Sequence, residues 1–117
     1  MTLVWEQIVI PALDPRSLGK WWCDALGWVV TIDTDEEFEI RPVPTSTPGM
    51  VFIPTDKQKT GQNRIHPDFR PDDQQAEVER LLRLGARRAD IGQGDQPWIV
   101  LLDVEGNEFC VLGNRKP

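Results

Sequence analysis

The feature of this sequence that most constrains its fold is a weak internal repeat with a period of about sixty residues. In the first copy, an apolar run contains Gln7 and leads to Asp14. In the second copy, His66 and Asp73 have the same separation. A helical pattern follows the aspartate in both copies and ends at a Leu-Gly dipeptide. Because several spacings agree at once, the chain is predicted to contain one supersecondary unit twice.

Each copy carries the signals that begin and end a helix. Aspartate is a preferred N-cap, proline suits the first helical position, and glycine adopts the left-handed conformation that ends many helices. These signals are Asp14, Pro15 and Gly27 in the first copy, and Asp72 or Asp73 with Gly85 in the second. Apolar residues at helical spacing should pack the helices onto the core. They are Leu18, Trp22, Ala25 and Leu26, then Val78, Leu81 and Leu82.

One strand candidate precedes each helix and three follow it. In the first copy they are Val4–Ile10, Trp28–Asp33, Phe38–Arg41 and Met50–Ile53. In the second they are Arg64–Phe69, Ala86–Ile91, Trp98–Asp103 and Glu108–Leu112. This order predicts an α+β fold of two βαβββ modules, related by a pseudo-two-fold axis, that form a curved mixed sheet around a cleft. Residues 1–117 would be a single domain, with module one at about 1–58, module two at about 62–117 and the polar segment Thr55–Asn63 as the link.

Strand alternation predicts which side chains face the cleft. Gln7 lies on the more polar face of its strand, as His66 and Asp68 do on theirs. Glu108 and Cys110 share one face of the last strand. Polar groups set among apolar ones are typical of a ligand cleft. The alternative is that this face is simply exposed to solvent, and the internal repeat favours the cleft.

The composition argues against some classes of function. The 117 residues have a formal net charge of −6 and no basic run, which disfavours binding to nucleic acid or to an anionic membrane. No apolar stretch approaches the roughly 20 residues of a membrane span, and no signal peptide is recognisable, so a cytoplasmic location is expected. Cys23 and Cys110 form no CxxC pattern and are expected to be reduced thiols.

Motifs along nearly the whole chain resemble those of the glyoxalase/bleomycin resistance protein/dioxygenase superfamily, which has the vicinal oxygen chelate fold. The segments that resemble its opening module are Ile8–Pro15, Trp21-Trp22 and Leu26–Trp28. Those that resemble the second module and the closing hairpin are Gln62–Asp68, Ala76–Leu82, Leu84–Ala86 and Asp103–Leu112. The resemblance implies a pocket for a small molecule and a homodimer. It leaves open whether the modules pair within one chain or between two.

The resemblance also implies a metal site, which this sequence retains only in part. Metal-dependent members use four ligands, with His or Gln from the first strand of each module and a carboxylate from the last. Carried onto this chain, the first ligand is Gln7, the third is His66, and the fourth falls on Cys110. The second falls near Val51–Ile53, where no side chain binds a metal. We therefore expect no required cofactor, and a divalent metal, if one binds, would be held by Gln7, His66 and Cys110. A dioxygenase is not expected, since its iron site wants two histidines and this chain has one.

Two functions follow from the residues and the resemblance. The first is a metal-free small-molecule binding protein of the bleomycin-resistance, ligand-sequestering kind. Its predicted ligand-binding residues are Trp5, Gln7, His66, Glu108 and Cys110, with Trp5 as the stacking aromatic. The second is a lyase or isomerase acting on an oxygenated small molecule, with His66 and Asp68 as the catalytic pair, with or without a divalent metal. A third option is an interaction domain that uses the fold only to dimerise.

Overall fold

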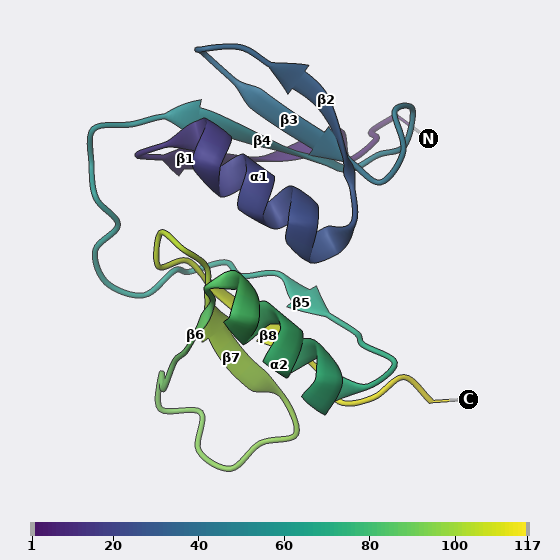
Figure 1. Ribbon diagram of the computed structural model, residues 1–117, viewed down its shortest axis with the longest axis vertical. Coiled ribbons are helices and arrows are strands. Elements are labelled where there is room, and N and C mark those ends of the chain that lie inside the picture. The colour runs from purple at the N-terminus through teal and green to yellow at the C-terminus, as the bar shows by residue number, and fades with distance from the viewer. Residues whose placement is uncertain (1, 117) are drawn as a thin grey trace. The chain divides into compact units, whose positions relative to one another are not determined.

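The structure is a computed structural model that describes residues 2–116. It divides into two compact units, Met1–Gln58 and Lys59–Pro117, hereafter the first and the second unit. The first unit contains β1 (Gln7–Ala12), α1 (Pro15–Leu26), β2 (Val29–Asp33), β3 (Phe38–Arg41) and β4 (Gly49–Pro54). The second contains β5 (Asp68–Phe69), α2 (Gln74–Leu84), β6 (Arg87–Arg88), β7 (Ile99–Leu102) and β8 (Glu108–Val111). Each unit has one strand, one helix and three strands, which confirms the predicted α+β fold of two βαβββ modules (Figure 1). That both units form one domain stays a prediction.

The two sheets have the same topology. The strand order is β1-β4-β3-β2 in the first unit and β5-β8-β7-β6 in the second. In each sheet the first and last strands of the module pair in parallel, and the other neighbours are antiparallel. Val9 therefore pairs with Val51 as Asp68 pairs with Cys110. The repeat in the sequence is thus a repeat of strand order and register.

The capping residues define both helices where the sequence predicts them. Asp14 caps α1 and Asp73, rather than Asp72, caps α2; each carboxylate accepts a hydrogen bond from the backbone N–H three residues further on. Gly27 and Gly85 end the helices with φ of 67° and 115°, values that favour glycine. Within residues 2–116, no helix is both long and apolar enough to span a membrane.

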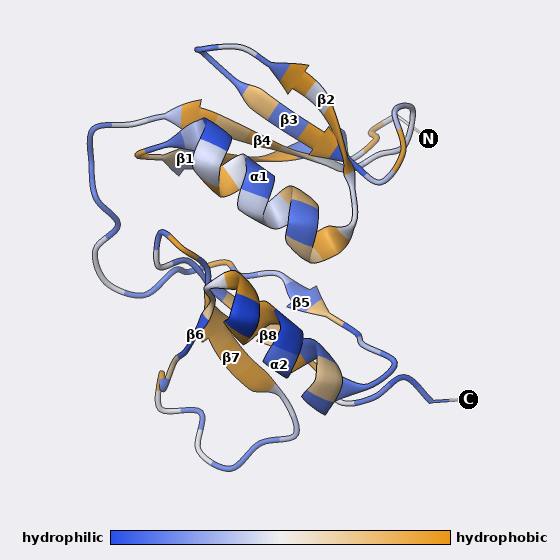
Figure 2. Cartoon of the chain, viewed as in Figure 1, coloured by the Kyte–Doolittle hydropathy of each residue, from blue (hydrophilic) through white to orange (hydrophobic). Residues whose placement is uncertain are grey.

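One face of each helix packs on the sheet of its own unit. α1 lies along β3 and β4, and α2 contacts β8 (Figure 1). The predicted apolar stripes are buried at Leu18, Trp22, Ala25, Val78 and Leu81, and half-buried at Leu26 and Leu82. Figure 2 shows this as alternating hydrophilic and hydrophobic segments along both helices, whereas β7 is hydrophobic along its length. The cores therefore form by the amphipathic packing that the periodicity predicts.

Three predicted strands differ from the observed ones by two residues or more at one end. The first begins at Gln7 rather than Val4, because its parallel partner β4 begins at Gly49, which pairs with Gln7. The fifth is confined to Asp68–Phe69, between Pro67 and Pro71, which have no N–H to give to a ladder. The sixth covers only Arg87–Arg88 before the chain enters a loop. Trp5 consequently lies outside β1, and 68% of its surface is exposed.

Candidate functional site

Three polar side chains converge on one face of the sheet in the second unit. Asp68 and Cys110 are paired across the parallel strands β5 and β8, and His66 precedes Asp68 by one step of strand alternation. The His66 Nδ1 atom lies 3.2 Å from Asp68 Oδ1 and 3.9 Å from Cys110 Sγ. The backbone holds this arrangement, because the Cys110 N–H donates a 3.0 Å hydrogen bond to the Pro67 carbonyl. The parallel pairing of β5 with β8 therefore brings His66, Asp68 and Cys110 together.

These side chains form one wall of a hollow of about 310 Å³. The rest of its lining is mostly apolar, comprising Ile91, Gly92, Gln93, Trp98 and Leu112. A concave site with an apolar wall and a few convergent polar groups is typical of small-molecule binding, and this volume is near the lower end for such sites. Every residue that lines the hollow belongs to the second unit.

Trp98 is the aromatic side chain of this hollow. The sequence analysis placed it at the start of a strand and gave it no role in binding. It precedes β7, at the end of the loop that follows β6. Hydrogen bonds order that loop: the Gly92 N–H donates to Asp90 Oδ1, and the Ile91 N–H donates to Gln93 Oε1. The signal available in the sequence was its position at the edge of a strand, directly after a Gly-rich turn. Trp98, with 36% of its surface exposed, is therefore placed to stack on a ligand.

The Cys110 thiol is a buried wall of the hollow and not an activated nucleophile. Only 2% of the residue's surface is exposed. Burial, followed by the charge and hydrogen bond of Asp68, raises the pKa of Cys110 to about 11. In the absence of a metal the sulfur therefore stays protonated at neutral pH, while nucleophilic cysteines need the thiolate. Both cysteines of the chain are free thiols.

Glu108 shares a sheet face with Cys110 but has internal partners. Its buried carboxylate forms a 2.6 Å ion pair with Lys59 and accepts a hydrogen bond from the Asn63 N–H. Burial raises the pKa of Glu108, but these hydrogen bonds and the lysine charge outweigh it, so the pKa lies below its usual value. The carboxylate thus fastens the segment before β5 to β8. Glu108 does not line the hollow, and its predicted ligand role stays a prediction.

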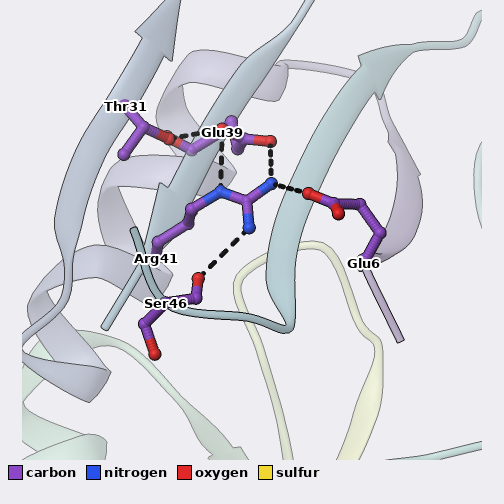
Figure 3. A network of polar contacts seen from close by, with 5 residues as sticks. All are labelled: Glu6, Thr31, Glu39, Arg41 and Ser46. Carbon is purple, nitrogen blue, oxygen red and sulfur yellow. Dashed lines mark hydrogen bonds and ion pairs between the residues drawn. The ribbon is translucent and has the colours of Figure 1, made fainter. Parts of the chain in front are cut away.

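A second polar cluster lies on the sheet of the first unit (Figure 3). The Arg41 guanidinium donates two hydrogen bonds to Glu39, one to Glu6 and one to the Ser46 carbonyl. Thr31 donates a further hydrogen bond of 2.6 Å to Glu39. The bond from Arg41 is the main cause that lowers the pKa of Glu39, against the effect of burial. The sequence analysis assigned these residues no role, although alternation along β3 puts both charged residues opposite the helix-facing side chains.

Residues 7–112 match the family model of the glyoxalase-like domain. The chain belongs to this family. No curated protein matches the glyoxalase-like chain.

Solved structures agree with this assignment. An enzyme of the glyoxalase/bleomycin resistance protein/dioxygenase family from Burkholderia phytofirmans PsJN aligns with a TM-score of 0.73 at 14% identity, covering 93% of this chain and 97% of that one. The trypanothione-dependent glyoxalase I of Leishmania major aligns with a TM-score of 0.70 at 14% identity, covering 96% and 87%. The bleomycin-binding protein of Streptomyces verticillus, in complex with copper(II)-bleomycin, aligns with a TM-score of 0.64 at 15% identity, covering 98% and 99%. At these identities the likeness establishes the shared fold.

The glyoxalase-like register explains why the expected metal ligands are incomplete. Val51 and Cys110 occupy equivalent positions in the two units. Val51 pairs with Val9, two residues after Gln7, and Cys110 pairs with Asp68, two residues after His66. Val51 is buried, and its side chain has no donor atom. Gln7 lies in the first unit, so its part in a site with His66 stays a prediction. Within the second unit, the imidazole, carboxylate and thiol of His66, Asp68 and Cys110 form a donor set that suits a divalent transition metal.

Proposed function

We propose that this protein binds a small organic molecule in the hollow of the second unit and acts by sequestering it. The observation that carries the proposal is the composition of that hollow, in which an aromatic and aliphatic wall faces the His66–Asp68 pair. The glyoxalase-like fold and its likeness to a bleomycin-binding protein support a binding role. At 15% identity that likeness supplies no ligand, so the ligand's chemistry is argued from the lining alone.

The lining favours a flat, largely apolar ligand that carries a hydrogen-bond donor. Trp98 offers an indole surface for stacking, and Ile91 and Leu112 extend the apolar wall. Asp68 offers a carboxylate that accepts hydrogen bonds and favours a neutral or cationic donor. The volume of about 310 Å³ limits the bound portion to a small ring system.

Binding can be tested with a panel of planar heteroaromatic amines, measured by ligand-observed NMR and by thermal shift. Trp98→Leu should weaken binding of every planar member, while Trp5→Leu, which removes a tryptophan outside the hollow, should leave it unchanged. Native mass spectrometry of gently purified protein would show whether a small molecule is carried through purification. If no member binds and no small molecule co-purifies, or if Trp5→Leu weakens binding as much as Trp98→Leu, this assignment of the site is wrong.

A second candidate function, a lyase or isomerase, is favoured by the geometry of His66. Its Nδ1 atom faces the Asp68 carboxylate at 3.2 Å, so Nε2 is the nitrogen available to take a proton from a ligand. Asp68 would orient the imidazole and stabilise the positive charge that develops when His66 accepts that proton. The substrate class would be an α-hydroxycarbonyl compound, whose carbon-bound proton beside the carbonyl is acidic enough to transfer to such a base.

This activity can be measured as deuterium exchange into dihydroxyacetone, followed by proton NMR. His66→Ala should abolish exchange, and Asp68→Asn should slow it and change its pH profile. Circular dichroism should show that both variants retain the fold. Exchange that is unchanged in His66→Ala would refute the acid–base role of this residue.

A further inference from the structure

We infer that the hollow beside His66, hereafter the first hollow, is one half of a longer site, and that its ligand is an aromatic ring with a flexible arm ending in an ammonium group. The arm lies in a second hollow of the same unit, of about 470 Å³, which is lined by residues of β6, β7 and the loop between them. This inference rests on the proposed function, because it extends the ligand that the first hollow is proposed to bind.

The two hollows adjoin at Gln93 and Trp98, which line both of them. The first hollow, of about 310 Å³, is large enough for a small ring system and little more. The Trp98 indole is the surface on which that ring is proposed to stack. A substituent that projects from the ring past Trp98 therefore has the second hollow directly beside it.

The loop that forms the second hollow, residues 90–97, is anchored at both ends. Before it, the Ala89 N–H donates a 3.0 Å hydrogen bond to the Val100 carbonyl of β7. At its end, Gln74 Nε2 of α2 donates a 2.8 Å hydrogen bond to the Pro97 carbonyl. The walls of the second hollow are therefore held in place before a ligand binds, which reduces the cost of ordering them on binding.

The second hollow is lined mainly by polar side chains, whereas the first offers an aromatic and aliphatic wall. Its charged and amide side chains are Arg88, Asp90, Gln93, Asp95 and Gln96. Two carboxylates and one guanidinium give this lining a formal net charge of −1. Carboxylate and amide oxygens accept hydrogen bonds from an ammonium group, and the net charge attracts a cation and repels an anion. The polar half of the site thus favours a cationic arm.

The arm needs only a weak contact, because the ring to which it is attached is already bound. Its binding is intramolecular, with an effective concentration that the length of the arm sets. Ion pairs exposed to solvent contribute little, and Asp90 and Asp95 are both exposed. The expected gain in affinity from the ammonium group is therefore about three- to tenfold. The gain should peak at one arm length, since a short arm does not reach the second hollow and a long one lowers the effective concentration.

The test measures the affinity of 4-(alkylamino)quinolines by isothermal titration calorimetry with the full chain. Straight arms of increasing length end in an ammonium, a methyl or a carboxylate group. At the best length, the ammonium arm should bind about three- to tenfold more tightly than the methyl arm, and the carboxylate arm should show no such gain. In NMR spectra, the ammonium arm should shift the backbone amide signals of Gly94 and Asp95, which 4-(methylamino)quinoline should leave in place.

The double variant Asp90→Asn/Asp95→Asn isolates the charge of the second hollow. Asparagine keeps an oxygen that can accept the 2.9 Å hydrogen bond from the Gly92 N–H to Asp90, so the loop should retain its conformation. The variant should lose the advantage of the ammonium arm and bind the methyl arm as before. Glu79→Gln is the matched control, because it removes an exposed carboxylate of the same unit that lines neither hollow, and it should change neither affinity.

Four outcomes would overturn the inference: equal binding of ammonium and methyl arms at every length, a gain with the carboxylate arm, an advantage retained in the double variant, or an equal loss in Glu79→Gln. If the methyl-arm quinolines bind and lose affinity in Trp98→Leu while the ammonium group adds nothing, the proposed function stands and this inference alone fails. If no quinoline binds, the first hollow is not a site for a planar ring, and both fail.

Discussion

Replacing Gly19 with alanine should destabilise the first unit, although helix propensity predicts the opposite. Gly19 lies within α1, where an exposed glycine is about 1 kcal/mol less favourable than alanine. The structure, however, places the helix directly against the Phe38 ring of β3. A Cβ atom at Gly19 would lie 2.2 Å from Phe38 Cδ1, 2.7 Å from Cε1 and 3.0 Å from Cγ. The glycine is thus required by the close approach of helix and sheet.

The magnitude follows from comparing these two effects. Carbon atoms in contact are normally about 3.5–4.0 Å apart, so either the ring or the helix must move by more than an ångström. Only 1% of the Phe38 surface is exposed, and the ring has no solvent to move into. Overpacking of this kind costs about 1–3 kcal/mol, which exceeds the gain of about 1 kcal/mol in propensity. A net loss of up to about 2 kcal/mol is expected, equivalent to a fall of up to roughly 30-fold in the ratio of folded to unfolded protein.

The assay is urea denaturation followed by tryptophan fluorescence, for which Trp21 and Trp22 on the same helix provide the signal. A double-mutant cycle with Phe38→Leu supplies the control, because the smaller side chain leaves room for the added methyl group. In that background Gly19→Ala should be neutral or stabilising, which gives a coupling of more than about 1 kcal/mol between the two positions. If Gly19→Ala raises the stability of the otherwise unchanged protein, or has the same effect in both backgrounds, the steric reasoning is wrong.

Three further predictions concern the cap, the first-unit network and the linker. Asp73→Ala should lower stability by about 1 kcal/mol in thermal unfolding, because the α2 cap is lost, while Asp72→Ala should change it much less. Because the neighbouring guanidinium lowers the pKa of Glu39, this group adds stability above its usual pKa of 4.5, and that stability is lost as pH falls through the lower folded value. Between about pH 6 and about pH 3, the Tm of Glu39→Gln should therefore fall less with decreasing pH than that of the unchanged protein. An equal fall of the Tm in both proteins would contradict this. Glu108→Gln removes the ionic partner of Lys59 and should speed cleavage by trypsin after Lys59. Equal cleavage rates in the two proteins would show that this ion pair does not restrain the linker.

The sequence predicts the architecture well because the relevant signals are local. Asp14 and Gly27 act on the turns of backbone next to them, and the apolar stripe of α1 is set by helical periodicity alone. The order of elements could therefore be derived without knowing which strands pair. The limits of the strands could not, because β1 begins where its partner β4 begins, and β5 is confined between two prolines. The prolines were visible in the sequence, whereas the register was not.

The site shows the same division between local and long-range information. Alternation within single strands predicted that His66 and Asp68 share one face of their strand, and that Glu108 and Cys110 share one face of the last strand. Only the parallel pairing of β5 with β8 decides that His66, Asp68 and Cys110 meet as three donors.

The partners of Glu108 and the placement of Trp98 in the hollow also depended on the tertiary structure. Glu108 meets Lys59 across a large separation in the chain, and the loop after β6 brings Trp98 into the same hollow as His66. Alternation reports only the side of a strand from which a residue projects. The group it meets there is decided by the packing of segments far apart in sequence, which no local pattern encodes.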